Sequence, residues 1–311
     1  MRIYRNLSEI KEIKKPVVTI GTFDGVHLGH QKIISQINDE AKKIGGESVL
    51  ITFFPHPRMV LQPESHNLKL LQTQSEKYSK LEKLGLQHVI EVPFTIDFAK
   101  LSALEFVQQI LVEALNLSVL VIGYDHQFGK NREGTIEFLR GVSETLNFEV
   151  VEISPLIIDD INISSTKIRR AIQEGDMQKV ALYLGDTYSL SGTVVKGKQL
   201  GRILGFPTAN LQLTESYKLA PGFGVYAVEV IVHDNKYYGM ANIGMRPTIN
   251  DGFGETIEVH IFDFSSDIYN QTLEVFFHHK IREEIKFENK ELLTKQLHQD
   301  EKTVRDFFNR F

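Results

Sequence analysis

The first part of the chain alternates two kinds of hydrophobic pattern. Short apolar runs, typical of buried strands, are separated by longer stretches with apolar residues at helical spacing. The strand-like runs cover Val17–Gly21, Ser48–Phe54, His88–Phe94, Val119–Gly123 and Phe148–Ser154. Helical spacing is clearest between Ile33 and Ile44 and between Val107 and Leu115. Strands that alternate with helices predict a Rossmann-like, doubly wound α/β domain with a parallel sheet covered on both faces.

From about Tyr188 the hydrophobic pattern follows a strand period instead of a helical one. Six strands are predicted, at Ser189–Val195, Pro207–Leu213, Gly224–Val232, Lys236–Gly244, Thr256–Phe264 and Thr272–Ile281. Closely spaced strands without helices between them predict a six-stranded antiparallel β-barrel. We therefore expect two domains, residues 1–186 and 187–311, with the boundary near Gly185–Tyr188.

The end of the chain returns to helical spacing. An apolar stripe is formed by Leu292, Leu293, Leu297, Val304, Phe307 and Phe308. This stripe predicts a terminal helix that packs on the barrel.

Composition limits the kinds of site, partner and cellular compartment that we expect for this protein. The 311 residues include no cysteine, which excludes disulfides and thiolate metal sites. Charges interrupt the N-terminal region, and no apolar run approaches the ~18 residues of a membrane span. The net charge is −5, and the densest basic cluster, Lys11, Lys14 and Lys15, is interleaved with Glu9 and Glu12. We expect a soluble, cytoplasmic protein, a monomer or weak homo-oligomer, without nucleic-acid or membrane partners.

The most informative segment is Gly21–Ile34, where a predicted strand ends and a helix begins. A helix N-terminus offers free N–H groups and a partial positive charge, which suit phosphate, and glycines let the backbone approach it. His27 and His30 are three residues apart and can share one helical face. Free imidazoles titrate near ~6.5, and nearby phosphate favours their charged form. The segment therefore predicts a site where two histidines neutralise a triphosphate.

Two other interpretations of this segment are a glycine-rich turn with two surface histidines and a metal-binding histidine pair. Zinc would need a third protein ligand, and no thiolate is available.

A second predicted helix start offers groups that could bind an anion. In Ile161–Asp176, Ser164 or Ser165 can cap a helix and Gly175 can end it. Hydroxyls and amides at a helix start, with Arg169 one turn in, make an anion clamp. The alternative is a plain capped helix with a surface arginine.

Both segments resemble a known superfamily. The run GTFDGVHLGHQ resembles the HxGH signature of nucleotidylyltransferases, in the form of the FAD synthetase branch, and ISSTKIRRAI resembles their second motif. The resemblance implies catalytic roles for His27 and His30. It also implies ATP binding by Gly21, Phe23, Asp24, Gly25, Gly29, Ser165, Thr166 and Arg169.

Two further segments fit the same branch. TFFPHPR resembles its TFxPHP loop, and GYDHQFGKNREG resembles its GxDFxFGxxRxG loop. The resemblance implies that Pro57, Asp125, Phe128 and Arg132 contact a flavin. Phe54 stands where the branch often has an acidic residue, and His126 replaces the usual aromatic.

The barrel region has its own signature, GRILGFPTANL at Gly201–Leu211. Thr208 and Asn210 are two apart, so their side chains face the same way and an oxygen from each could ligate Mg²⁺. The alternative is a turn followed by two partly buried polar residues. The segment closely resembles the PTAN motif of riboflavin kinases, which implies that Gly201, Gly205 and Pro207 bind the nucleotide.

The strand Thr256–Phe264 alternates apolar residues with Glu258 and His260. A kinase needs a base or an orienting carboxylate beside the attacking hydroxyl. The resemblance assigns this role to Glu258; we interpret His260 as structural. It also implies that Arg282, in a segment that folds over the flavin, binds flavin.

Together, motifs from Gly21 to about Phe287 resemble the bifunctional riboflavin kinase/FMN adenylyltransferase family. This implies riboflavin, FMN and ATP as substrates, Mg²⁺ as cofactor, and FMN and FAD as products. Three alternatives stay open: an adenylyltransferase with another acceptor, such as phosphopantetheine or nicotinate mononucleotide; a barrel that binds nucleic acid; and a non-catalytic flavin sensor.

Overall fold

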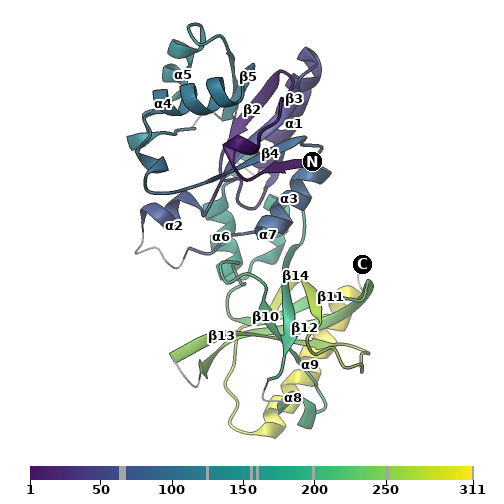
Figure 1. The fold of residues 1–311 in the computed structure, drawn as a ribbon. Coiled ribbons are helices and arrows are strands. Elements are labelled where there is room, and N and C mark those ends of the chain that lie inside the picture. The colour runs from purple at the N-terminus through teal and green to yellow at the C-terminus, as the bar shows by residue number, and fades with distance from the viewer. Residues whose placement is uncertain are drawn as a thin grey trace. The chain divides into compact units, whose positions relative to one another are not determined.

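A computed structural model describes residues 1–62, 68–123, 126–154, 157–158, 161–197, 200–248 and 252–309 (Figure 1). The chain forms two compact units, residues 1–164 and 165–311.

The first unit is built on a six-stranded sheet with the order β1-β4-β3-β2-β5-β6, in which every pairing is parallel. Its strands are β1 (Arg2–Tyr4), β2 (Pro16–Ile20), β3 (Glu47–Phe54), β4 (His88–Pro93), β5 (Val119–Gly123) and β6 (Glu149–Ile153). The five predicted strands are confirmed, and β1 is an edge strand that the sequence pattern did not predict. A short antiparallel pair, β7 (Ile157–Ile158) and β8 (Ile161–Asn162), completes the unit.

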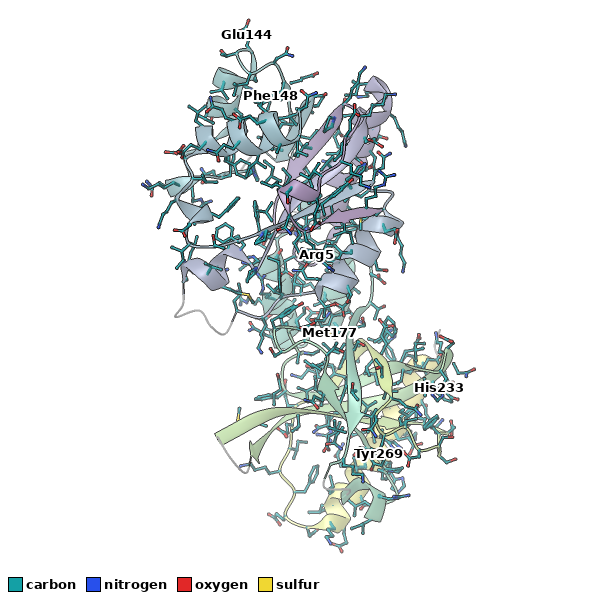
Figure 2. All side chains as sticks on the ribbon, viewed as in Figure 1. Arg5, Glu144, Phe148, Met177, His233 and Tyr269 are labelled. Carbon is teal, nitrogen blue, oxygen red and sulfur yellow. The ribbon has the colours of Figure 1, made fainter. Side chains whose placement is uncertain are left out.

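Helices cover both faces of this sheet. They are α1 (Leu28–Ile44), α2 (Pro57–Leu61), α3 (Gln74–Lys83), α4 (Ala103–Phe106), the π-helix η4 (Val107–Ala114) and α5 (Ile136–Ser143). Val17 and Leu50 face the core that contains α1 and α3, whereas their neighbours Val18 and Ile51 face the core of η4 and α5. Phe148, labelled in Figure 2, belongs to the second of these cores. This two-sided burial confirms the doubly wound α/β prediction.

The second unit is a closed six-stranded barrel with helices before, within and after it. Its helices are α6 (Ser165–Glu174), α7 (Met177–Leu184), α8 (Leu200–Ile203) and α9 (Lys290–Phe308). Its strands are β9 (Tyr188–Val195), β10 (Ala209–Leu213), β11 (Gly224–Val232), β12 (Asn235–Thr248), β13 (Gly252–Ile261) and β14 (Thr272–Arg282). They pair antiparallel in the closed order β10-β13-β12-β11-β14-β9, which confirms the barrel prediction.

The terminal helix α9 packs against β12 and β14 of the barrel (Figure 1). Val304 is fully buried, and Phe307 and Phe308 pack on the same core. Leu292 is 46% exposed, so its predicted place in the packed stripe is wrong. It lies in the first turn of α9, next to the Asn289 cap, before the helix reaches the barrel core.

Candidate active sites

The loop between β2 and α1 is a buried and conformationally unusual turn. Phe23 and Val26 have φ angles of 49° and 38°, in the left-handed region that non-glycine residues seldom adopt. For a β-branched valine this conformation is strained, and such strain concentrates at functional sites. Phe23 and Val26 are also almost inaccessible to solvent, so packing against the sheet holds the turn in place.

Polar contacts from the Leu71 backbone, from β3 and from α3 fix the same loop. The Oδ1 atom of Asp24 accepts a hydrogen bond from the Leu71 amide at 2.9 Å. The carbonyl of Thr22 accepts from the Thr52 hydroxyl at 3.2 Å and from Lys77 Nζ at 3.5 Å. The predicted nucleotide-binding residue Asp24 is therefore a loop anchor in this structure.

Lys77 is a residue that sequence reasoning missed. Its side chain is buried, and its Nζ also donates to Thr52 Oγ1 at 3.2 Å. Burial lowers the pKa of Lys77 to about 8, although Glu91 and Asp24 favour the charged form. A lysine on a largely polar helix gives no sequence signal for burial, so only the fold places this cation under the loop.

His27 is the N-cap residue of α1. Its Nδ1 accepts a hydrogen bond from the backbone N–H of His30 at 3.3 Å. In a neutral ring this leaves the hydrogen on Nε2. Burial, and then the charge of Lys80, lower the pKa of His27 to about 4.

His30 stacks between two rings, with centroid distances of 3.6 Å to His27 and 4.5 Å to Phe23. Its Nδ1 is buried and has no hydrogen-bond partner among the described residues. Burial, followed by His27, Lys77 and Lys80, lowers the pKa of His30 well below its ordinary value. Both imidazoles are therefore neutral at pH 7 until an anion approaches, and the unpaired Nδ1 is a polar group still to be satisfied.

Aromatic rings gather at the carboxyl ends of the parallel strands. Phe53, at the end of β3, is 5.7 Å from both Phe94 and Phe98. Phe106 continues the cluster, 6.1 Å from Phe98 and 5.2 Å from Phe128. This aromatic cluster is an apolar wall at the edge of the sheet where ligands bind in such folds. Of its members, only Phe128 was predicted as a site residue.

The predicted flavin loop closes on itself around Phe128. The backbones of Phe128 and Gly134 exchange hydrogen bonds at 3.2 and 2.9 Å. Gly129, at φ 73°, lies against the backbone of Ala103, so a side chain there would collide with α4. Arg132 is exposed in the same turn, and Asp125 lies outside the described residues.

The TFFPHPR loop follows β3. Pro57 occupies the first turn of α2 and is half-buried, and the Phe54–Pro55 bond is cis. Pro57 thus follows Phe53 of the aromatic cluster closely along the chain.

The second phosphate motif lies on α6, in the second unit. Ser165 and Thr166 open the helix, and Arg169 is half-buried one turn later. Gly175 ends it, at φ 80°, with its amide bonded to the Ile172 carbonyl at 3.1 Å. The predicted helix and its glycine end are confirmed.

In the barrel, three polar side chains form a row across adjacent strands. Glu258 on β13 pairs directly with Asn210 on β10 and with Asn242 on β12. Side chains of directly paired residues share a face and lie ~5 Å apart at Cβ. Asn242 had no role in the sequence analysis, because only strand pairing shows that it adjoins Glu258.

Gly197 makes room for this row. A Cβ at this position would collide with the side-chain amide of Asn210. Gly197, two residues beyond the end of β9, must therefore be glycine if Asn210 is to keep its orientation.

The turn that precedes Thr208 is closed by backbone bonds. The Phe206 amide donates to the Gly201 carbonyl at 2.8 Å, and Gly205 has a φ of 83°. Phe206 is buried, whereas Pro207 is exposed and Thr208 half-buried. The structure brings Gly201, Gly205 and Pro207 together in one turn that leads into β10.

Arg282 is held by α9. Its guanidinium donates to both oxygens of Asp300, at 3.0, 3.0 and 2.7 Å, and Asp300 is only 3% exposed. The structure therefore gives Arg282 a structural partner, and its flavin contact remains a prediction.

Two members of this row and the neighbouring Thr208 form a donor set that fits a magnesium ion. Thr208, Asn210 and Glu258 offer oxygen ligands, which Mg²⁺ prefers over nitrogen or sulfur. Within the residues that the structure describes, no group of three or more His, Asp or Glu side chains is arranged as a metal cluster.

Comparison with known families defines the class of protein. The FAD synthetase family matches residues 9–167, and the riboflavin kinase family matches residues 184–308. The chain is therefore an enzyme of flavin cofactor synthesis, with an N-terminal FAD synthetase domain and a C-terminal riboflavin kinase domain.

Full-length relatives make the assignment specific. A bifunctional riboflavin kinase/FMN adenylyltransferase of Listeria monocytogenes is 40% identical, over 94% of this chain and 92% of the relative. One from Buchnera aphidicola is 37% identical, over 99% of both chains. The chain belongs to the family of bifunctional riboflavin kinase/FMN adenylyltransferases.

A solved structure shares the whole fold. A crystal structure from Streptococcus pneumoniae, described as a macrolide-efflux protein, matches with a TM-score of 0.89 and 34% identity, covering 97% of this chain and 98% of that one. Among the described helices of the present chain, none is long and apolar enough to cross a membrane.

Proposed function

We propose that residues 187–311 phosphorylate riboflavin to FMN and that residues 1–186 adenylylate FMN to FAD. The boundary is supported by the start of β9 at Tyr188, where the barrel begins. The compact units divide earlier, after Ser164, because α7 packs on β9 and β14 of the barrel and α6 packs on α7. The HxGH-type and ISSTKIRR motifs together support assigning α6 to adenylyl transfer.

The observation that carries the kinase proposal is Glu258 between Asn210 and Asn242. Glu258 takes the proton of the terminal ribityl hydroxyl as its oxygen bonds to the γ-phosphorus and the bond to the ADP oxygen breaks. Thr208 and Asn210 would hold Mg²⁺, which supplies charge neutralisation for the phosphates when bound. Gly201, Gly205 and Pro207 form the turn over the nucleotide.

In the adenylyltransferase, an FMN phosphate oxygen attacks the α-phosphorus of ATP and pyrophosphate leaves. Positioning and electrostatics carry such a reaction, without a protein nucleophile. The N–H groups at the start of α1 and the Nε2–H of His27 are donors for phosphate oxygens, and His30 presents its unpaired ring nitrogen. The glycines at 21, 25 and 29, with Phe23 and Asp24, shape the nucleotide loop. Ser165, Thr166 and Arg169 bind the remaining phosphate charge.

The aromatic cluster around Phe53 and Phe128 supports an FMN site at the strand ends. Flat apolar rings suit the isoalloxazine ring, since offset and edge contacts between aromatic groups are favourable. Pro57, Asp125 and Arg132 complete this proposed flavin site, and Arg282 contacts riboflavin in the kinase domain.

The cellular setting is also a proposal. The chain acts in the cytoplasm as a monomer or weak homo-oligomer, on small-molecule substrates alone. Absence of cysteine from its sequence suits a reducing compartment.

A two-variant assay tests the function. Glu258→Gln should slow FMN formation from riboflavin and ATP by about 10²-fold or more, because the proton acceptor is lost. It should leave FAD formation from FMN unchanged. His30→Ala should show the reverse pattern. Both products are separated by chromatography over time, with Mg²⁺ present.

Glu274→Gln is the matched control, since Glu274 is an exposed glutamate on another barrel strand. Its rates should match the unmodified chain. A normal kinase rate in Glu258→Gln would remove Glu258 from the proposed mechanism.

A further inference from the structure

His260 connects the two halves of the kinase site. It lies on β13 two residues beyond Glu258, so the two side chains share a face of the strand. Its Nδ1 is 2.7 Å from the carbonyl oxygen of Pro207. A carbonyl only accepts hydrogen bonds, so Nδ1 carries the hydrogen and donates it.

This contact holds the chain just before the polar residues Thr208 and Asn210. Upstream, the turn is closed by the Phe206 amide on the Gly201 carbonyl. Pro207 has no backbone N–H, so its carbonyl is the backbone hydrogen-bonding group left to anchor it. The next side chain along the chain is that of Thr208.

Aromatic packing supports the same turn. The buried Phe206 ring meets His260 edge-on at 5.2 Å and His298 of α9 at 4.9 Å. Two histidines thus touch one phenylalanine, and a hydrogen bond to the Pro207 carbonyl comes from His260. A comparison of His260 with His298 can therefore separate the contribution of ring packing from that of the hydrogen bond.

We propose that His260 is a positioning residue of the kinase site, whose Nδ1–H holds the Pro207 carbonyl and so fixes Thr208 and Asn210 at a set distance from Glu258. This inference rests on the proposed metal role of Thr208 and Asn210. The neighbours of metal ligands commonly orient them, and their loss weakens metal binding by about 10- to 100-fold.

Asparagine and glutamine substitutions distinguish the hydrogen bond from ring packing. The amide nitrogen of asparagine can take the place of Nδ1, whereas that of glutamine lies near the place of Nε2. His260→Asn should therefore preserve the bond and His260→Gln should lose it. His298→Asn is the control for packing on Phe206.

The first measurement is hydrogen exchange of the segment 200–213 in the purified chain, without nucleotide or metal. Loss of one hydrogen bond costs about 1 kcal/mol, so exchange there should be roughly fivefold faster in His260→Gln. His260→Asn and His298→Asn should exchange like the unmodified chain, and β11 should be unchanged in all. Equal exchange in the Asn and Gln variants would overturn the proposal.

The second measurement is the Mg²⁺ concentration that half-activates FMN formation. It should rise about tenfold in His260→Gln and return toward normal in His260→Asn, while FMN adenylylation stays constant in both. An unchanged Mg²⁺ requirement in His260→Gln would overturn the inference. Asn210→Ala tests the proposed metal role separately. A normal Mg²⁺ requirement in this variant would contradict the proposed function of Asn210. The hydrogen-exchange result would still show whether His260 holds the Pro207 carbonyl.

Discussion

The surroundings of the stacked residues His27 and His30 determine whether their imidazole rings are charged. The sequence predicts two imidazoles that become charged beside phosphate. The structure adds that the rings are stacked at 3.6 Å, that Nδ1 of His27 is used as a helix cap, and that lysines lie nearby. Burial first, and then each of these features, favours the neutral ring until an anion arrives.

Titration of His27 should make stability depend on pH. Its folded pKa of about 4 lies below the unfolded value of ~6.5, so the unfolded chain binds more protons between these values. The stabilisation is complete above pH ~6.5 and is lost as the pH falls toward 4. Relative to His27→Asn, which keeps a capping acceptor without titrating, the native chain should lose about 2 kcal/mol of unfolding free energy between pH 7.5 and 5. Chemical unfolding followed by circular dichroism at both pH values measures this difference.

His233→Asn is the control for this comparison, because His233 is exposed beyond β11 (Figure 2). Its unfolding free energy should follow the native chain at both pH values. A pH-independent gap between the native chain and His27→Asn would show that His27 titrates normally.

The two kinds of site residue differ in how far the sequence could reveal them. His27 and Glu258 lie in motifs that resemble those of known families, and that resemblance implies their roles. Lys77 and Asn242 do not, because one depends on a helix folding over a loop and the other on strand register. Register is a long-range property, and no local pattern around Asn242 contains it.

Among the elements, α9 is attached to β14 by a buried ion pair. Asp300 accepts three hydrogen bonds from Arg282 and a fourth, at 2.8 Å, from Gln296. This pair lies in the middle of the helix, between the exposed first turn and the apolar contacts of Val304.

Asp300→Ala should lower the unfolding free energy of the second unit by about 3 kcal/mol, because it leaves the Arg282 charge without its buried partner. Leu292→Ala, on the exposed first turn of the same helix, should change it by less than about 0.5 kcal/mol. Urea unfolding of the full chain, followed by circular dichroism, compares them. Equal effects would mean that the ion pair does not attach α9.

Element prediction succeeded where periodicity was long and failed where it was short. The barrel strands and the core strands of the sheet were predicted from apolar runs and are confirmed. β1 has three residues and one buried side chain, so it offers no period to detect. Its parallel pairing with β4 depends on a strand far along the chain. Leu292 satisfied the helical period yet is 46% exposed, because periodicity does not show where a partner surface ends.

At the scale of the whole molecule, the residues that we propose for the two activities form separate sets. The Glu258 row belongs to the barrel, and the paired imidazoles belong to the parallel-sheet unit. The product of one reaction is the substrate of the other.

Equal amounts of Glu258→Gln and His30→Ala chains, mixed with riboflavin, ATP and Mg²⁺, should make FAD after a lag, although neither variant does so alone. FMN made by the His30→Ala chain would be adenylylated by the Glu258→Gln chain. A time course by chromatography shows the FMN intermediate rising and then falling. If FMN accumulates while no FAD forms, FMN released into solution does not reach the second active site.

Barrel closure also sets the order of events during synthesis on the ribosome. β9, the first barrel strand, pairs with β14, the last, with Thr193 opposite Thr272. The barrel therefore cannot close until β14 has been synthesised. The sheet of the first unit needs no residue beyond β6, which ends at Ile153. N-terminal domains generally fold first as the chain emerges. A nascent chain halted before residue 272 would therefore hold a complete parallel sheet and an open barrel with an unpaired β9 edge, the kind of edge on which other chains aggregate.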